Sequence, residues 1–210
     1  MLIVRLALLT CLQRHYGVDP TPWLVEARDR PFAERLETPT LPDMFWQKYV
    51  PGPIEPVTEA DADPGRIRFE PLFRAAYPKS GLKAVHFMGR ALTVHEKIAA
   101  PLARVEKRLA GHKEWARFFS PLGGGFNDRV IAGTERTSAH AWGIAVDLNP
   151  DLGDYWRWQK GGWKNRVPQG IVDAFEAEGF IWGGRWFHFD TMHFEYRPEL
   201  LDGSCRDPAP

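Results

Sequence analysis

Cysteine is scarce in this chain, and neither sign of charge dominates it. Only Cys11 and Cys205 occur among the 210 residues, which excludes a cysteine-rich zinc module. Lysine plus arginine and aspartate plus glutamate both number 27, so the formal net charge is zero. Proteins that bind nucleic acids usually carry a basic excess or a basic stripe, and neither is visible. We therefore expect no nucleic-acid partner.

Long apolar runs and internal repeats are also absent. No apolar run reaches the length of a membrane span, so none is expected. Hydrophobic residues make up 44% and charged residues 26% of the chain, a balance typical of globular proteins and not of disordered ones. At 24.0 kDa the chain can form one well-packed domain with added segments, and it is too short for two ordinary domains. We expect a monomer.

The N-terminal third differs in composition from the rest. Its first dozen residues, MLIVRLALLTCL, contain one arginine and a short apolar stretch. Such a stretch is typical of a secretory signal or anchor, or else of a buried strand or helix. Residues 18–65 are rich in proline and acidic residues, which predicts an irregular arm with an exposed loop at 55–65. We expect an arm over 1–65, the main domain over 66–201 and a tail over 202–210.

The two cysteines lie near opposite ends of the chain. In an oxidising compartment they could form a disulfide, and elsewhere they could be two unrelated thiols. Their positions alone leave both interpretations open.

Periodicity indicates two helices and two strands. A helix is predicted over 91–110 and another over Gln169–Glu178, which Pro168 precedes and Gly179 follows. Strands are predicted where apolar and polar residues alternate, around 144–148 and 192–197. The segment IWGGRWF between them is typical of a hairpin-type turn. These elements predict an α+β domain with a small, mainly antiparallel sheet and helices packed on one face. The apolar face of the first helix comprises Leu92, Ile98, Leu102, Val105 and Leu109.

Two short segments carry groups that can ligate a metal, SAHAWGIAVDL from Ser138 and DTMHFE from Asp190. His140 and Asp147 are an odd number of residues apart, so one straight strand would place them on opposite faces. Gly143 between them permits a turn that brings His140 back beside Asp147.

Histidine and carboxylate side chains are the usual protein ligands of zinc in hydrolases, three at a time, with one position left for water. His140, Asp147 and His193 supply this set, and Asp190 is a carboxylate close by in sequence that could act as the general base. Each residue alone is more typical of a surface histidine or a turn-forming aspartate. Together they predict one zinc ion per chain.

The pattern S-x-H-x-x-G-x-A-x-D, followed by D-x-x-H, resembles the M15 family of zinc peptidases. The resemblance covers roughly residues 122–199. It implies the fold of the hedgehog and D-Ala-D-Ala peptidase group, zinc ligation by His140, Asp147 and His193, and Asp190 as catalytic base. Many members have glutamate at the position of Asp190. In having aspartate there, this sequence is similar to the endolysin-like branch.

The same resemblance implies an arginine near the metal, for which Arg129 is the better match and Arg136 the other candidate. A guanidinium there suits a substrate carboxylate or the scissile carbonyl. Ser138 and Glu195 are candidate supporting residues, Ser138 with a turn role as its alternative and Glu195 as a residue that orients a ligand. His188 is more typical of a packed or solvent-facing histidine. Six of the nine tryptophans lie between 142 and 186, in the core or along a substrate groove.

The resemblance implies hydrolysis of peptidoglycan stem peptides in the cell envelope, periplasmic or extracellular. The first expectation is a D-Ala-D-Ala-type carboxypeptidase, and the second an L-Ala-D-Glu endopeptidase similar to phage endolysins. A different class of protein is the third: a non-catalytic module that holds wall peptides and keeps zinc for structure. Asp190 argues against this third reading, because a purely structural site has no use for a base.

Overall fold

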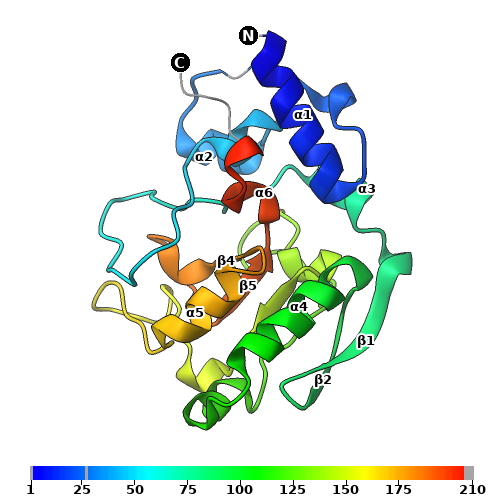
Figure 1. Cartoon of the computed structure of the whole chain (residues 1–210). Helices are drawn as coiled ribbons and strands as arrows, with labels where there is room; N and C mark the ends of the chain where they lie inside the picture. Colours follow the sequence, from blue (N-terminus) through cyan, green and yellow to red (C-terminus); the bar gives the residue numbers. More distant parts are fainter. Residues whose placement is uncertain (1, 27, 206–210) are drawn as a thin grey trace.

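The computed structural model describes residues 2–26 and 28–205. Met1 and residues 206–210 of the predicted tail lie outside the described residues. One part of the molecule holds two small sheets and the two helices that cover them, and the other helices gather beside this part (Figure 1). Both sheets are antiparallel, so the predicted α+β class is confirmed.

The larger sheet has three strands in the order β3–β5–β4, namely β3 (Ala145–Asp147), β5 (His193–Tyr196) and β4 (Phe180–Trp182). The strands predicted around 144–148 and 192–197 are β3 and β5, which pair antiparallel. The predicted turn at Gly183 and Gly184 opens the connection between β4 and β5 with the 3-10 turn η7 (Gly183–Arg185). β5 is therefore the central strand, with a partner on each side.

Two helices cover this sheet and the hairpin beside it. α5 (Gln169–Glu176) begins after Pro168 and packs on β4, and it ends within two residues of the predicted position. α4 (Glu96–Leu109) packs on α5 and β1. Its buried face consists of Ile98, Pro101, Leu102, Val105 and Leu109, four of which belong to the predicted apolar face.

The predicted start of the first helix, at residue 91, is wrong. Residues 90–95 form strand β2 (Arg90–His95), which pairs with β1 (Leu82–Phe87). Met88 and Gly89 join the strands with positive φ angles of 50° and 74°, the backbone of a tight hairpin turn. Leu92 fits the helical spacing of α4 by coincidence, because it also alternates with Val94 on the buried side of the hairpin. The helix starts only where the side chain of His95 accepts from the backbone of Lys97.

Residues 2–16 form helix α1 (Leu2–Tyr16), and its side chains Leu8, Leu12 and Tyr16 are buried in the main core. At the other end of the chain, α6 (Pro198–Leu201) and the 3-10 turn η8 (Gly203–Cys205) lie against α1 (Figure 1). Cys11 and Cys205 form a disulfide with 5.1 Å between their Cα atoms. Of the two alternatives left open for the cysteines, the structure shows the disulfide.

The segment over 18–65 contains the short helix α2 (Phe32–Glu37), and α3 (Glu70–Ala76) follows it. Residues 58–61 are exposed, as expected of a loop, but Asp63 is fully buried. Among the described residues, no helix combines the length and apolar character needed to cross a membrane. The remaining 3-10 turns are η1 (Thr21–Trp23), η2 (Pro42–Phe45), η3 (Lys79–Gly81), η4 (Lys113–Phe119), η5 (Ala139–Trp142) and η6 (Pro150–Leu152).

Candidate metal centre and catalytic site

The register of the central sheet places Asp147 beside His193. The two residues lie directly opposite each other in the β3–β5 ladder, so their side chains share one face of the sheet. Asp147 Oδ1 is 3.0 Å from His193 Nδ1. Glu195, two residues further along β5, lies on the same face opposite Ala145, whose small side chain leaves room for it.

His140 reaches this pair from the turn before β3. Ser138 begins η5 by accepting a hydrogen bond from the backbone of His140, and Gly143 ends the turn with a φ of 69°. A Cβ at Gly143 would lie 2.6 Å from Leu82 Cδ2, so both the backbone and the space require glycine. The turn expected at Gly143 is present. It brings His140 Nε2 to 3.2 Å from His193 Nδ1 and 3.2 Å from Asp147 Oδ2.

These three side chains fit a zinc ion. Tetrahedral zinc with bonds of about 2.0–2.1 Å holds its ligand atoms about 3.3 Å apart, close to the separations of His140, Asp147 and His193. The outer ring nitrogens of both histidines are already engaged. His140 Nδ1 is 2.6 Å from the carbonyl oxygen of Gly125, and His193 Nε2 is 3.0 Å from Glu195 Oε2. With these nitrogens as hydrogen-bond donors, the lone pairs of His140 Nε2 and His193 Nδ1 face the point between the three side chains, where a metal ion would lie.

Two arginines stabilise the negative charge of Glu195. Its carboxylate is fully buried, and it accepts from Arg68 Nε at 3.0 Å and Arg197 Nη1 at 3.1 Å as well as from His193. Burial alone would raise the pKa of Glu195, but Arg68, the His193 hydrogen bond and Arg197 together hold this pKa well below its usual range. Glu195, which contacts His193 Nε2, is thus charged at neutral pH.

Asp147 and His193 form an ion pair. Burial disfavours charge on both, but the His193 pKa is raised to about 10 by Asp147 and Glu195, which face its two ring nitrogens. The pKa of Asp147 is correspondingly held well below its usual range by His140 and His193, against the opposing effect of burial. A metal ion bound here would replace a proton as the positive charge between these side chains.

Asp190 lies beside this centre with a free carboxylate oxygen. Its Oδ1 atom is buried and has no hydrogen-bond partner among the described residues, whereas its backbone is fixed by donation to the Gly183 carbonyl at 3.0 Å. Burial, and then the negative charge of Asp147, raise the pKa of Asp190 to about 7. A buried carboxylate oxygen without a partner is costly, and such groups are typical of catalytic sites.

The site opens into a cleft of about 280 Å³. Of the six tryptophans in the cluster, Trp156, Trp158 and Trp186 line this cleft, while Trp142 and Trp182 are buried in the main core. The cluster therefore serves both purposes that the sequence left open. Trp158 is 63% exposed, so its indole faces the solvent at the cleft.

Arg129, Arg136 and Ser138 differ in their relation to the cleft. Arg129 lines it, and its guanidinium contributes to the electrostatic environment of Asp190. Arg136 instead lines a neighbouring cavity of about 200 Å³ with Arg66 and Arg68. Burial there, followed by repulsion from Arg68 and Arg66, lowers the pKa of Arg136 to about 10. Ser138 has the turn role, as the cap of η5, and its side chain also borders the cleft.

Two features of the site escaped the sequence analysis. Arg68 contacts Glu195 from 127 positions away in the chain, and nothing in the segment RIRF indicates that contact. His188 also lines the cleft, and its Nδ1 atom is 2.6 Å from the buried carboxylate of Asp63. Asp63 in the arm thus contacts a residue of the cleft wall, and no local pattern in the arm predicts this contact.

We expect Glu195→Gln to weaken zinc binding by about 10–100-fold, because loss of an outer carboxylate partner typically has that effect. The amide keeps the shape of the side chain but removes the charge that holds the proton on His193 Nε2. Competition with a calibrated chelator measures the affinity of folded protein. The exposed Glu59, changed to glutamine, is the matched control. Equal zinc affinity in Glu195→Gln and the control would rule out the orienting role of Glu195.

Comparison with known families bears on the segment that builds this site. Residues 132–196 match the model of a family described as D-alanyl-D-alanine carboxypeptidase, of the M15 peptidases. This segment includes His140, Asp147, Asp190 and His193, and the match confirms the resemblance stated from the two motifs. No curated protein and no solved structure matches the chain significantly. Residues 132–196, which carry the candidate site, are therefore similar to an M15 peptidase family.

Proposed function

We propose that the chain is a zinc peptidase that hydrolyses peptide bonds in peptidoglycan stem peptides, with a D-Ala-D-Ala-type carboxypeptidase activity. One observation carries this proposal. The candidate ligand atoms of His140, Asp147 and His193 lie 3.0–3.2 Å from one another. Beside them is the buried carboxylate oxygen of Asp190, which has no hydrogen-bond partner within the described part of the chain. A structural metal site has four protein ligands and needs no such base, whereas a catalytic one has three and a base nearby.

Each residue has a separate task in this proposal. Zinc, when bound by His140, Asp147 and His193, supplies a Lewis acid that polarises the scissile carbonyl and makes water more acidic. Asp190 accepts the proton of the attacking water at Oδ1 and passes it to the leaving amine. Glu195 holds His193 in the orientation in which Nδ1 faces the centre.

A carboxypeptidase must also recognise the free carboxylate at the end of its substrate. Arg129 suits this task, because it lines the cleft and its side chain has no ion pair among the described residues. Arg66 and Arg68 also line the cleft, but Asp63 and Glu195 respectively occupy their guanidinium groups. Arg129 is therefore the guanidinium available to a substrate carboxylate, which it can bind with two parallel hydrogen bonds.

The aromatic wall of the cleft is compatible with a substrate larger than a dipeptide. The rings of Tyr155 and Trp158 pack edge to face with their centroids 5.2 Å apart, and both residues line the cleft. Exposed aromatic faces bind apolar portions of peptides and sugars well. We accordingly propose the cell envelope, where peptidoglycan is found, as the place of action.

The bond that is cleaved can be read directly from product masses. Purified stem pentapeptides incubated with the zinc-loaded protein should lose the terminal D-alanine, as followed by mass spectrometry. The same peptides with a C-terminal amide are the matched control, and they should react at least about tenfold more slowly, because Arg129 has no carboxylate to bind. Products of cleavage between L-alanine and D-glutamate would instead support the endopeptidase alternative. Aspartate at position 190 is similar to that branch of the family.

A binding module remains the alternative from another class. It would bind stem peptides in a zinc-dependent way and release no product at any enzyme concentration. The same incubation therefore separates it from both peptidases, provided that binding is measured in parallel by calorimetry.

A further inference from the structure

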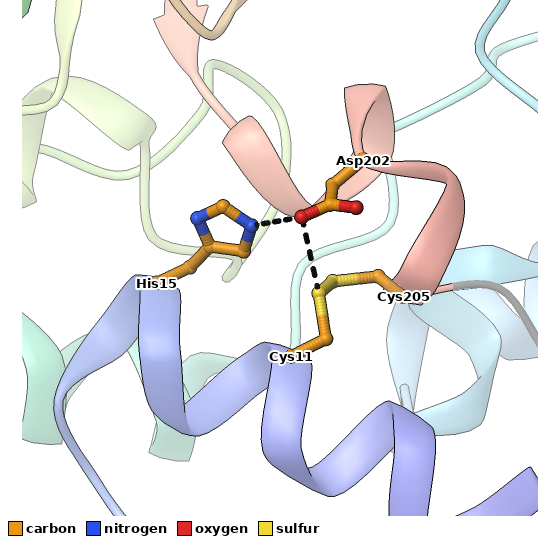
Figure 2. A group of neighbouring side chains, drawn as sticks. All are labelled: Cys11, His15, Asp202 and Cys205. Carbon is orange, nitrogen blue, oxygen red and sulfur yellow. Dashed lines mark hydrogen bonds and ion pairs between the residues drawn. A yellow bond between two sulfur atoms is a disulfide. The ribbon is translucent and has the colours of Figure 1, made fainter.

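A second group of potential metal ligands lies where the two ends of the chain meet. It consists of Cys11 and His15 from α1 together with Asp202 and Cys205 from the C-terminal segment (Figure 2). One ligand atom from each of the four lies within 4.8 Å of the others. His15 Nε2 is 2.9 Å from Asp202 Oδ2, and that oxygen is 3.7 Å from Cys11 Sγ. The group is separate from the site in the cleft and shares no residue with it.

Local structure holds these four side chains together in pairs. Cys11 and His15 are four residues apart in α1, so they project from the same face of the helix. Asp202 and Cys205 are three apart, and the backbone of Cys205 donates to the Asp202 carbonyl at 3.0 Å, which closes the turn between them. Contact between α1 and η8 then brings the pairs face to face.

We propose that these four residues form a second zinc site when the Cys11–Cys205 disulfide is reduced. Two thiolates, an imidazole and a carboxylate are all ligands of zinc, and four protein ligands without an open position make a structural site. The sulfur atoms also favour zinc over calcium and magnesium, which take oxygen ligands. In a tetrahedral site the two sulfur atoms would be about 3.7 Å apart, so breaking the disulfide is what opens the space.

Reduction of the disulfide and binding of zinc balance in electrons and protons. A dithiol reductant supplies two electrons and two protons, the S–S bond breaks, and the reductant is left as a disulfide. Zinc binding then releases the two protons from Cys11 and Cys205 to solvent. Two thiolates and the Asp202 carboxylate carry three negative charges, which the divalent ion and the guanidinium of Arg14 neutralise. Arg14 is already in position, with Nη2 3.4 Å from Cys11 Sγ and an ion pair to Asp202.

The consequence is that the ends of the chain stay linked in either redox state. The disulfide joins α1 to η8 under oxidising conditions, and zinc would join the same two elements under reducing ones. This inference is independent of the proposed function, because neither redox state alters His140, Asp147 or His193.

The test uses the full chain carrying His140→Ala and His193→Ala, which removes the ligands in the cleft. After dialysis against zinc and then against metal-free buffer, we expect about one zinc per chain in reduced protein and about none in oxidised protein. Cobalt is the second probe, and it should give sulfur-to-cobalt charge-transfer absorption in the reduced protein alone. If the double variant does not fold, the unaltered chain should bind about two zinc ions when reduced and about one when oxidised.

Single changes within the group identify its ligands. His15→Ala and Asp202→Asn, each in the double variant, should weaken zinc binding to the reduced chain at least about tenfold. The exposed His86, changed to alanine, is the matched control and should have no effect. The proposal is overturned if the reduced chain binds no zinc in either background. It is equally overturned if His15→Ala and Asp202→Asn both bind as tightly as the control, since the thiols alone would then hold the metal.

Discussion

Replacing Asp190 with asparagine is expected to leave the protein folded and loaded with zinc while slowing hydrolysis at least about a hundredfold, since general-base catalysis typically contributes about 10²–10⁴-fold. Asparagine keeps the shape of the side chain but cannot accept a proton. The metal ligands are unchanged, and the buried Oδ1 of Asp190 has no partner among the described residues that the amide would disrupt. Turnover of stem peptides and zinc content, measured on the same preparation, check both halves of this expectation.

Two companion variants make the result specific. The exposed Asp151, changed to asparagine, is the matched control and should hydrolyse the substrate at the parent rate. Asp190→Glu should retain part of the activity, because glutamate is also a carboxylate base. If Asp190→Asn turns over as fast as the parent, the base is another residue, and His188, which also lines the cleft, would be the next to change.

The second large effect concerns stability. Removing the disulfide with Cys11→Ser and Cys205→Ser should lower the free energy of unfolding by about 3–5 kcal/mol, because the bond closes a loop that spans 194 positions and so restricts the unfolded chain strongly. For a protein of this size, that loss corresponds to a decrease in Tm of about 10–15 °C. The comparison is made in chelator, so that no metal contributes to the stability of either protein.

The ion pairs around the disulfide need a separate control. Asp202→Asn keeps the disulfide but weakens the contacts of Asp202 with Arg14 and His15. These groups are partly exposed, so the variant should lose no more than about 1 kcal/mol. Equal Tm values for the double serine variant and the parent would mean that α1 and η8 stay together without a covalent link.

The candidate metal ligands could be predicted from the sequence because each lies in a short, ordered motif. Asp147 and His193 occupy strands whose alternation is visible, and antiparallel pairing of those strands is enough to bring the two together. His140 needs only the turn that Gly143 allows. Local rules of turn and strand therefore suffice for the central geometry.

The supporting residues depend on contacts that no local pattern records. Arg68 and Asp63 reach Glu195 and His188 across more than a hundred positions, and only the folded chain brings them there. Pairing of Cys11 with Cys205 likewise requires that α1 dock on the C-terminal segment. The hairpin β1–β2 was missed for a different reason, since its turn contains Met88 at a positive φ, where turns usually have glycine or asparagine.

Zinc held by His140, Asp147 and His193 should be required for hydrolysis of stem peptides. The most direct measurement is turnover before and after removal of metal by a chelator, and again after zinc is restored, with zinc counted in the same samples. We expect activity to disappear with the metal and to return with about one zinc per oxidised chain. In His140→Ala/His193→Ala, zinc should not restore it. Hydrolysis that persists in the metal-free protein at the parent rate would contradict this expectation.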